Sequence, residues 1–160
     1  MADRGFTHLD PLGRANMVDV TLKDATLRRA MARCKVFAAP ETTAMIANNA
    51  VTKGDVLATA RVAGIQAAKR TAELIPLCHP LLAGAAQIHF NIGDDHIEVE
   101  VRTETFDRTG VEMEAMTAAA IAALTIYDMC KSIDPNMVVG DVALWEKTGG
   151  RSGQWHRPAS

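Results

Sequence analysis

Two strictly alternating segments constrain the fold of this chain more than any other feature. Apolar and polar residues alternate over residues 87–92 and again over residues 96–102, with Gly93-Asp94-Asp95 between them. A period of two places the apolar side chains of a strand on one face. A short connection rich in Gly and Asp joins antiparallel strands. The two segments therefore predict an antiparallel hairpin with one buried and one solvated face.

Helices are predicted on both sides of the hairpin. Pro40 stands in a first turn, Asp55 is a good N-cap and Pro76 ends a helical pattern, which together predict helices over 40–49, 56–75 and 111–131. The spacing of Ala60, Gly64 and Ala68 lets another backbone approach the second helix closely.

Further strands are expected over residues 17–20, 33–38 and 137–145, the last with an interruption at Gly140-Asp141. Residues 26–39 are ambiguous, because cations alternate with apolar residues in their second half while Ala and Leu favour a helix. The order of elements predicts an α+β fold in which helices pack on one face of an antiparallel sheet.

Length and charge limit the classes of protein that this chain can represent. Its 160 residues fit a single domain over 1–160, with an irregular arm at 1–15 and a flexible, Gly-rich C-terminal tail at 148–160. Seventeen Lys and Arg against nineteen Asp and Glu give a net charge of −2, which does not favour a nucleic-acid partner. We expect a cytoplasmic protein without a signal peptide or membrane span.

The cysteine and histidine pattern does not favour a metal site. Three cysteines are widely spaced without a C-x-x-C motif, which predicts reduced thiols. The five histidines lack H-x-x-x-H or H-E-x-x-H spacing, so we expect no dedicated transition-metal site.

Polar residues inside apolar stretches are the candidates for chemistry. Asp128 and Lys131 lie three residues apart near the end of an apolar helix, either as a local ion pair or as a catalytic acid–base pair. Lys53 precedes Gly54 at the start of a helix, where it either binds an anion such as phosphate or is a solvated loop lysine.

The loop between Pro76 and Pro80 is predicted to be stiff and to hold His79 in one place. His79 is then a candidate for proton transfer or ligand binding. Its neighbour Cys78 suggests a thiol nucleophile, but adjacent residues in an extended loop point apart, which makes His79 a poor base for that thiol.

Two glutamates flank Met113 at the start of the last helix. Glu112 and Glu114 suit a helix N-terminus, and their separation of two residues keeps them off one face unless the turn is still extended. Fourteen residues place Glu114 and Asp128 about 21 Å apart along the axis. If both serve one site, helices of neighbouring subunits must lie antiparallel there.

Several motifs together resemble the molybdenum cofactor biosynthesis protein C (MoaC) family. They are Met17-Val18-Asp19-Val20, Lys53-Gly54-Asp55-Val56, Leu74-Ile75-Pro76-Leu77-Cys78-His79-Pro80-Leu81, Thr109-Gly110-Val111-Glu112-Met113-Glu114-Ala115 and Ala123-Leu124-Thr125-Ile126-Tyr127-Asp128-Met129-Cys130-Lys131. The resemblance implies a ferredoxin-like subunit in a hexamer built as a trimer of dimers, with sites between subunits. It also implies a role as cyclic pyranopterin monophosphate synthase, a lyase of molybdopterin biosynthesis.

The resemblance also implies a substrate and a set of site residues. The substrate would be 3′,8-cyclo-7,8-dihydroguanosine 5′-triphosphate, and the products cyclic pyranopterin monophosphate and pyrophosphate. Catalytic roles would fall on Lys53, Asp128 and Lys131, and substrate binding on Leu77, Cys78, His79, Glu112, Met113, Glu114 and Lys147. Arg151 departs from a lysine expected in the family. No cofactor is implied, and whether Mg²⁺ accompanies the triphosphate stays open.

Two other functions remain as alternatives. A ferredoxin-like regulatory oligomer that binds a nucleotide between subunits would also explain the sheet, the small-residue stripe and Lys53. A hydrolase that depends on Cys78 is the third interpretation.

Overall fold

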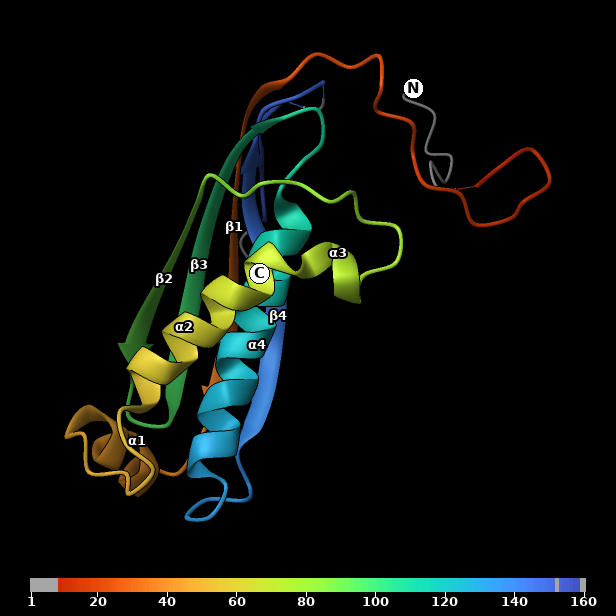
Figure 1. Cartoon of the computed structure of the whole chain (residues 1–160). Helices are drawn as coiled ribbons and strands as arrows, with labels where there is room; N and C mark the ends of the chain where they lie inside the picture. Colours follow the sequence, from red (N-terminus) through yellow and green to blue (C-terminus); the bar gives the residue numbers. More distant parts are fainter. Residues whose placement is uncertain (1–8, 152, 159–160) are drawn as a thin grey trace.

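The fold is built on a five-stranded antiparallel sheet with the strand order β2-β3-β1-β4-β5 (Figure 1). The computed structural model describes residues 9–151 and 153–158. Its elements, in chain order, are β1 (Thr26–Phe37), α1 (Pro40–Ala47), α2 (Val56–Lys69), α3 (Thr71–Leu74), β2 (Ala85–Ile92), β3 (His96–Asp107), α4 (Glu112–Cys130), β4 (Val138–Thr148) and β5 (Trp155–His156). The predicted ferredoxin-like α+β fold is confirmed, with β5 added at one edge.

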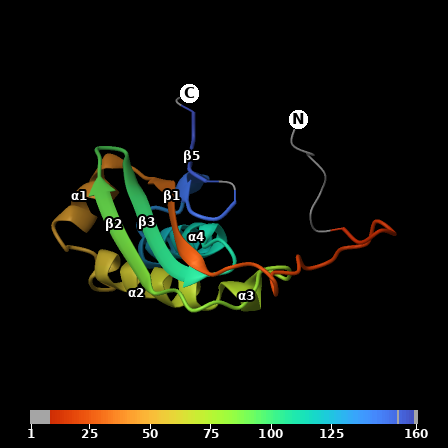
Figure 2. The ribbon, with the colours of Figure 1, turned by 90° about the horizontal axis from the view of Figure 1, so that it is seen from above.

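The register of β1 against β3 explains why one face of the sheet is buried. Ala32 lies opposite Val101, and Val36 lies opposite Ile97, and none of these four side chains is accessible to solvent. Directly opposed residues share a face, so the apolar positions of both strands form one continuous surface. This surface faces the helices, which pack on one side of the strands (Figure 2).

The same register places charges on the outer face. Arg33 lies opposite Glu100, and the guanidinium Nη2 is 2.7 Å from a carboxylate oxygen. Arg102 donates to the other oxygen of Glu100 at 2.8 Å. Opposite charges on cross-strand neighbours support this register at the solvated face.

Small residues fill the interface between α2 and α4. Gly64 packs so closely on α4 that an added Cβ would lie 3.0 Å from the carbonyl oxygen of Ala118 and 3.2 Å from the Cβ of Ala122. Ala60, Ala118 and Ala122 are inaccessible to solvent. The predicted stripe of small residues therefore serves close backbone approach.

Helix α4 is the core of the molecule and positions both ends of the candidate site. Its length and hydropathy would suffice to cross a membrane, but 56% of that apolar stretch is buried within the fold, as in the core helix of a sheet-and-helix protein. It packs on β1, β3 and β4. The predicted bounds of this helix are confirmed to within a residue.

Two predicted elements differ most from their predicted extent. β1 begins at Thr26 rather than Arg33, because inward apolar positions at Ala30 and Ala32 pair with β3 and outweigh the helix propensity of alanine. The helix predicted over 56–75 breaks at Arg70, whose amide bonds to the carbonyl of Ala67. The hydroxyl of Thr71 bonds to the same carbonyl, and such competition with backbone bonds disfavours a continuous helix.

The ends of the chain also differ from expectation. The strand predicted over 17–20 is wrong, since these residues belong to no strand. The turn at Asp10-Pro11-Leu12-Gly13 is confirmed, with the Asp10 side chain accepting from the amide of Leu12, while residues 1–8 of the predicted arm lie outside the described residues. Within the segment predicted as a tail, Thr148 ends β4, and Trp155 pairs with Lys147.

The interruption predicted at Gly140-Asp141 is confirmed as a bulge. The pairing of β1 with β4 shifts register between Arg33 and Lys35, and Asp141 adopts a φ of 56°. β4 nevertheless continues through the bulge to Thr148 as one strand. The bulge lets β4 follow β1 while its last residues reach the N-terminal end of α4.

Candidate active site

A cavity of about 680 Å³ lies at the N-terminal end of α4, and we call it the α4 N-terminal cavity. Its walls come from the segment before and at the start of β1, the loop after α3, the first turn of α4 and the Gly-rich segment after β4. Seven residues predicted to bind substrate line it together: Leu77, Cys78, His79, Glu112, Met113, Glu114 and Lys147.

Glu114 is the most perturbed acid of this cavity. Its side chain is 4% exposed, and this burial raises its pKa to about 7, with the nearby Glu112 carboxylate adding to the increase. Desolvation penalises the charged form of a carboxyl group, so the protonated form gains weight at neutral pH. A carboxyl group with a pKa near 7 can donate and accept protons under physiological conditions.

Glu112 and Glu114 line the same cavity although they stand two residues apart. This arrangement is explained by the position of Glu112, which is the first residue of α4, where the cavity surrounds the helix end. The carboxylate of Glu112 accepts from the Lys147 ammonium at 3.0 Å. This half-buried ion pair links the start of α4 to the end of β4.

His79 is held by a backbone contact. Its Nε2 lies 2.7 Å from the carbonyl oxygen of Val18, and because a carbonyl only accepts, Nε2 must carry the proton. In the neutral ring Nδ1 is then the acceptor nitrogen. The residues predicted as a strand at 17–20 thus supply an orienting contact for His79.

Cys78 is poorly suited to act as a nucleophile. Partial burial raises the pKa of its thiol, and the neighbouring Glu114 carboxylate raises it further. The thiolate is the reactive form of cysteine, so this environment lowers reactivity. The electrostatics of the cavity therefore disfavour a hydrolase that depends on Cys78.

The cavity contains more positive charge than the sequence patterns indicated. Besides Lys147, its lining includes five further cations: Lys23, Arg28, Arg29, Arg108 and Arg151. Four of them were not predicted as site residues, because cations near the ends of strands resemble an ordinary solvated edge. The sequence feature that could have indicated these residues is the excess of cations over acids in residues 23–29.

A second cluster lies at the opposite end of α4. The Lys131 ammonium is 2.7 Å from the Asp128 carboxylate, and Lys53 donates to the backbone carbonyl of Asp128 at 2.8 Å. The hydrogen bond from Lys131, its charge and the charge of Lys53 lower the pKa of Asp128, whereas Asp128 raises the pKa of Lys131. Asp128 is therefore ionised and Lys131 protonated at neutral pH.

The two groups of candidate residues do not meet within one chain. Glu114 lies in the first turn of α4, and Asp128 lies in its last turn. Fourteen residues of α-helix place them about 21 Å apart along the axis. A single small substrate cannot contact both groups of one chain.

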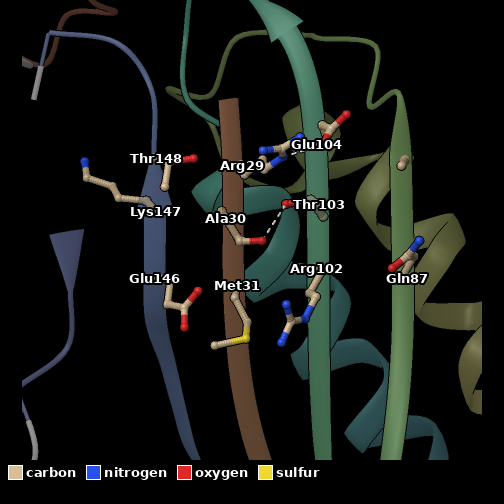
Figure 3. A pocket seen from close by; sticks show the side chains of 11 residues that line it. Arg29, Ala30, Met31, Gln87, Arg102, Thr103, Glu104, Glu146, Lys147 and Thr148 are labelled. Carbon is tan, nitrogen blue, oxygen red and sulfur yellow. Dashed lines mark hydrogen bonds and ion pairs between the residues drawn. The ribbon is translucent and has the colours of Figure 1, made fainter. Parts of the chain in front are cut away.

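A smaller cavity of about 310 Å³ lies on the outer face of the sheet. Arg29, Met31, Arg102 and Glu146 line it, whereas the Lys147 side chain extends away from them (Figure 3). Arg29 and Arg102 are both paired with glutamates. Apart from Lys147, no predicted site residue contributes to this cavity.

A metal site built by side chains is not found in residues 9–151 and 153–158. No three His, Cys, Asp or Glu side chains in this part of the chain come close enough to hold an ion. The acids of the α4 N-terminal cavity are too few and too strongly countered by cations to form such a site.

Comparison with known proteins gives a consistent result. Residues 17–150 match the MoaC family. The cyclic pyranopterin monophosphate synthase of Heliobacterium modesticaldum is 54% identical over 154 residues, which cover 95% of this chain and 97% of that protein. The synthase of Thermomicrobium roseum is 56% identical, with 95% and 93% covered. That of Chloroflexus aurantiacus is 54% identical, with 98% of each chain covered.

Proposed function

This chain belongs to the MoaC family, and on that premise we propose that it is a cyclic pyranopterin monophosphate synthase of molybdenum cofactor biosynthesis. As a lyase it converts (8S)-3′,8-cyclo-7,8-dihydroguanosine 5′-triphosphate to cyclic pyranopterin monophosphate and releases pyrophosphate. The observation that carries the proposal is the α4 N-terminal cavity, where the seven residues that the resemblance assigns to substrate binding converge.

The charges of both clusters suit this reaction. A nucleoside triphosphate carries about four negative charges, and cations stabilise the phosphate chain and the departing pyrophosphate. Ring opening and pterin closure need proton transfers at several atoms. Glu114, with its pKa near 7, and the ionised Asp128 beside protonated Lys131 provide groups that donate and accept protons. His79 and Glu114 assist or position the base.

The proposed site combines two chains. Because 14 residues of α4 separate the clusters by about 21 Å, the cavity of one protomer must receive Lys53, Asp128 and Lys131 from a neighbour. Two α4 helices that lie antiparallel across a dimer interface bring opposite ends together. Three such dimers form the hexamer that we propose, in the cytoplasm. Any Mg²⁺ would enter with the triphosphate rather than as a resident cofactor.

Turnover of the cyclised GTP derivative tests the proposal directly. The purified protein should release pyrophosphate and form the pterin product. Asp128→Asn and Lys131→Ala should leave the assembly intact and lower turnover by about 100-fold or more, because each removes a proton-transfer or charge-stabilising group. Lys69→Ala, at the end of α2, is the matched control and should retain activity. Nucleotide binding without turnover would instead identify a regulatory binding module.

Subunit complementation tests the composite site. Chains with Asp128→Asn and chains with Glu114→Gln are unfolded, mixed in equal amounts and refolded. If each site takes one cluster from each protomer, half of the dimers are mixed and each has one intact site, which restores about one quarter of wild-type turnover. A mixture as inactive as its components would refute the shared site.

A further inference from the structure

We propose that Thr103 and Thr105 are positioning residues, whose buried hydroxyl groups hold two walls of the α4 N-terminal cavity against β3. Thr103 fixes the first turn of α4, and Thr105 fixes the loop after α3. The inference rests on the proposed function where it concerns turnover, because it assigns each hydroxyl to one wall of that site. Neither threonine lines the cavity, so each acts through the residues that it holds.

The inward face of β3 changes from aliphatic to hydroxyl side chains as the strand approaches the cavity. Its buried positions are, in order, Ile97, Val99, Val101, Thr103 and Thr105. Both threonines are 2% exposed. Valine has nearly the shape of threonine but no polar atom, whereas a buried hydroxyl costs free energy unless it finds a partner. The two hydroxyls at the cavity end of β3 therefore need acceptors, and each has one on a different wall.

Thr103 contacts the residue that precedes α4. Its hydroxyl oxygen lies 3.1 Å from the carbonyl oxygen of Val111 and 3.5 Å from that of Ala30 (Figure 3 shows the longer contact). A hydroxyl group donates a single proton, so the shorter contact is the stronger hydrogen bond. The amide of Ala115 donates to the same Val111 carbonyl at a longer 3.3 Å. Thr103 thus ties the helix start that carries Glu114 to the sheet.

The loop after α3 lacks the burial that usually fixes a segment in place. In residues 72–87, a stretch that the structure describes without a gap, no side chain is buried, and Leu82 is 90% exposed. The hydroxyl of Thr105 donates to the Leu82 carbonyl at 2.8 Å. Hydrogen bonds rather than buried side chains therefore hold this loop, which also carries Cys78 and His79.

The two hydroxyls should affect different steps of the reaction. Thr103 holds the turn that carries Glu114, a proposed proton-transfer group, and a small displacement of such a group slows the chemical step. Thr105 holds the loop that carries residues assigned to substrate binding, so its loss should mainly weaken binding. The contrast between kcat and KM therefore distinguishes positioning from a general loss of stability.

Steady-state kinetics of valine variants test both roles. Thr103→Val should lower kcat about 10-fold or more and leave KM within about 2-fold of the wild-type value. Thr105→Val should raise KM about 5-fold or more and leave kcat within about 2-fold. Both variants should fold, because valine suits a strand and fills the same space. Thr103→Ser and Thr105→Ser keep the hydroxyl and should restore most of each loss.

Thr43→Val is the matched control. Thr43 is 3% exposed, and its hydroxyl lies 2.9 Å from the carbonyl oxygens of Pro40 and Asp94, outside the cavity. This variant should lose stability like the others and keep the wild-type kcat and KM. Wild-type kinetics in both β3 valine variants, serine variants as impaired as the valine variants, or an equal impairment of Thr43→Val would overturn the proposal.

A double-mutant cycle tests whether Thr103 acts through Glu114. In the background of Glu114→Gln, Thr103→Val should lower kcat by less than about 2-fold, because the carboxyl group that it positions is already absent. A merely structural effect of Thr103 would be the same in both backgrounds. Fully additive losses would therefore overturn the positioning of Glu114 by Thr103.

Thiol labelling tests the loop without any substrate. Cys34 and Cys130 are buried, so the fast reaction with a chromogenic disulfide reagent should come from Cys78 and disappear in Cys78→Ser. Thr105→Val should accelerate this reaction about 5-fold or more, because the loop opens more often. Thr105→Ser and Thr43→Val should react at the wild-type rate. An unchanged rate in Thr105→Val would overturn the role of Thr105.

The proposed function and the positioning roles fail differently. Turnover of the cyclised GTP derivative that is unaffected by Thr103→Val and Thr105→Val would overturn the positioning roles alone. Labelling of Cys78 that depends on Thr105, in a protein that does not release pyrophosphate from this substrate, would support the role of Thr105 and overturn the proposed function.

Discussion

Replacing Glu114 with glutamine should change the pH dependence of stability in a defined direction. Burial raises the pKa of Glu114 from its ordinary value of 4.5 to about 7 in the folded chain. The folded state therefore holds a proton that the unfolded state releases between these two values. The contribution of protonated Glu114 to the free energy of unfolding is therefore fully present below pH 4.5, and this contribution is lost as the pH rises through 7.

The size of the effect follows from the shift. Each pKa unit corresponds to about 1.4 kcal/mol, so the charged form of Glu114 lowers the free energy of unfolding by about 3 kcal/mol above pH 8. Glu114→Gln removes this dependence while keeping the shape of the side chain. As the pH rises from 5 to 8, the free energy of unfolding of the variant should therefore increase by about 2–3 kcal/mol relative to that of the wild type.

Urea unfolding at fixed protomer concentration, followed by fluorescence and circular dichroism, measures this difference. A fixed concentration is needed because assembly contributes to stability. Glu112→Gln is the control, since its half-exposed carboxylate is paired with Lys147. A stability difference between wild type and Glu114→Gln that stays constant from pH 5 to pH 8 would refute the reasoning.

Three further changes test other contacts. Gly64→Ala should lower the free energy of unfolding by about 1–3 kcal/mol in urea titrations, because the added methyl group meets the Ala118 carbonyl; an unchanged midpoint would contradict this. Asp134→Ala should cost about 1–3 kcal/mol in thermal unfolding, since its carboxylate accepts from the amide of Ala39 and the hydroxyl of Thr42; an unaltered melting temperature would argue against that contribution. Cys78→Ser should retain more than about a tenth of turnover, whereas loss of a covalent nucleophile removes several orders of magnitude.

The parts of the fold that the sequence predicts well are those with a regular period. The hairpin of β2 and β3 and the helix α4 were predictable because their apolar residues repeat with one period over many positions. β1 was only half predicted, since Ala30 and Ala32 are compatible with a helix until the pairing with β3 is known. The break at Arg70 depends on a side chain–backbone bond of Thr71, which periodicity does not contain.

The candidate site divides in the same way. Motifs identified residues such as His79 and Glu114, which the structure brings to one cavity. They did not identify Arg28, which also lines that cavity, because its position there depends on the face of β1 that it occupies. The pKa of Glu114 was equally out of reach, since it results from three-dimensional burial.

Because α2 and α4 approach each other closely, their interface should tolerate smaller side chains better than larger ones. Where Gly64, Ala118 and Ala122 meet, there is little side-chain volume to remove, so truncation leaves no large void. Any larger residue must instead push the helices apart and tilt α4. Since α4 carries candidate site residues at both ends, natural variation at these positions should be limited to the smallest amino acids, even though none of them touches the substrate.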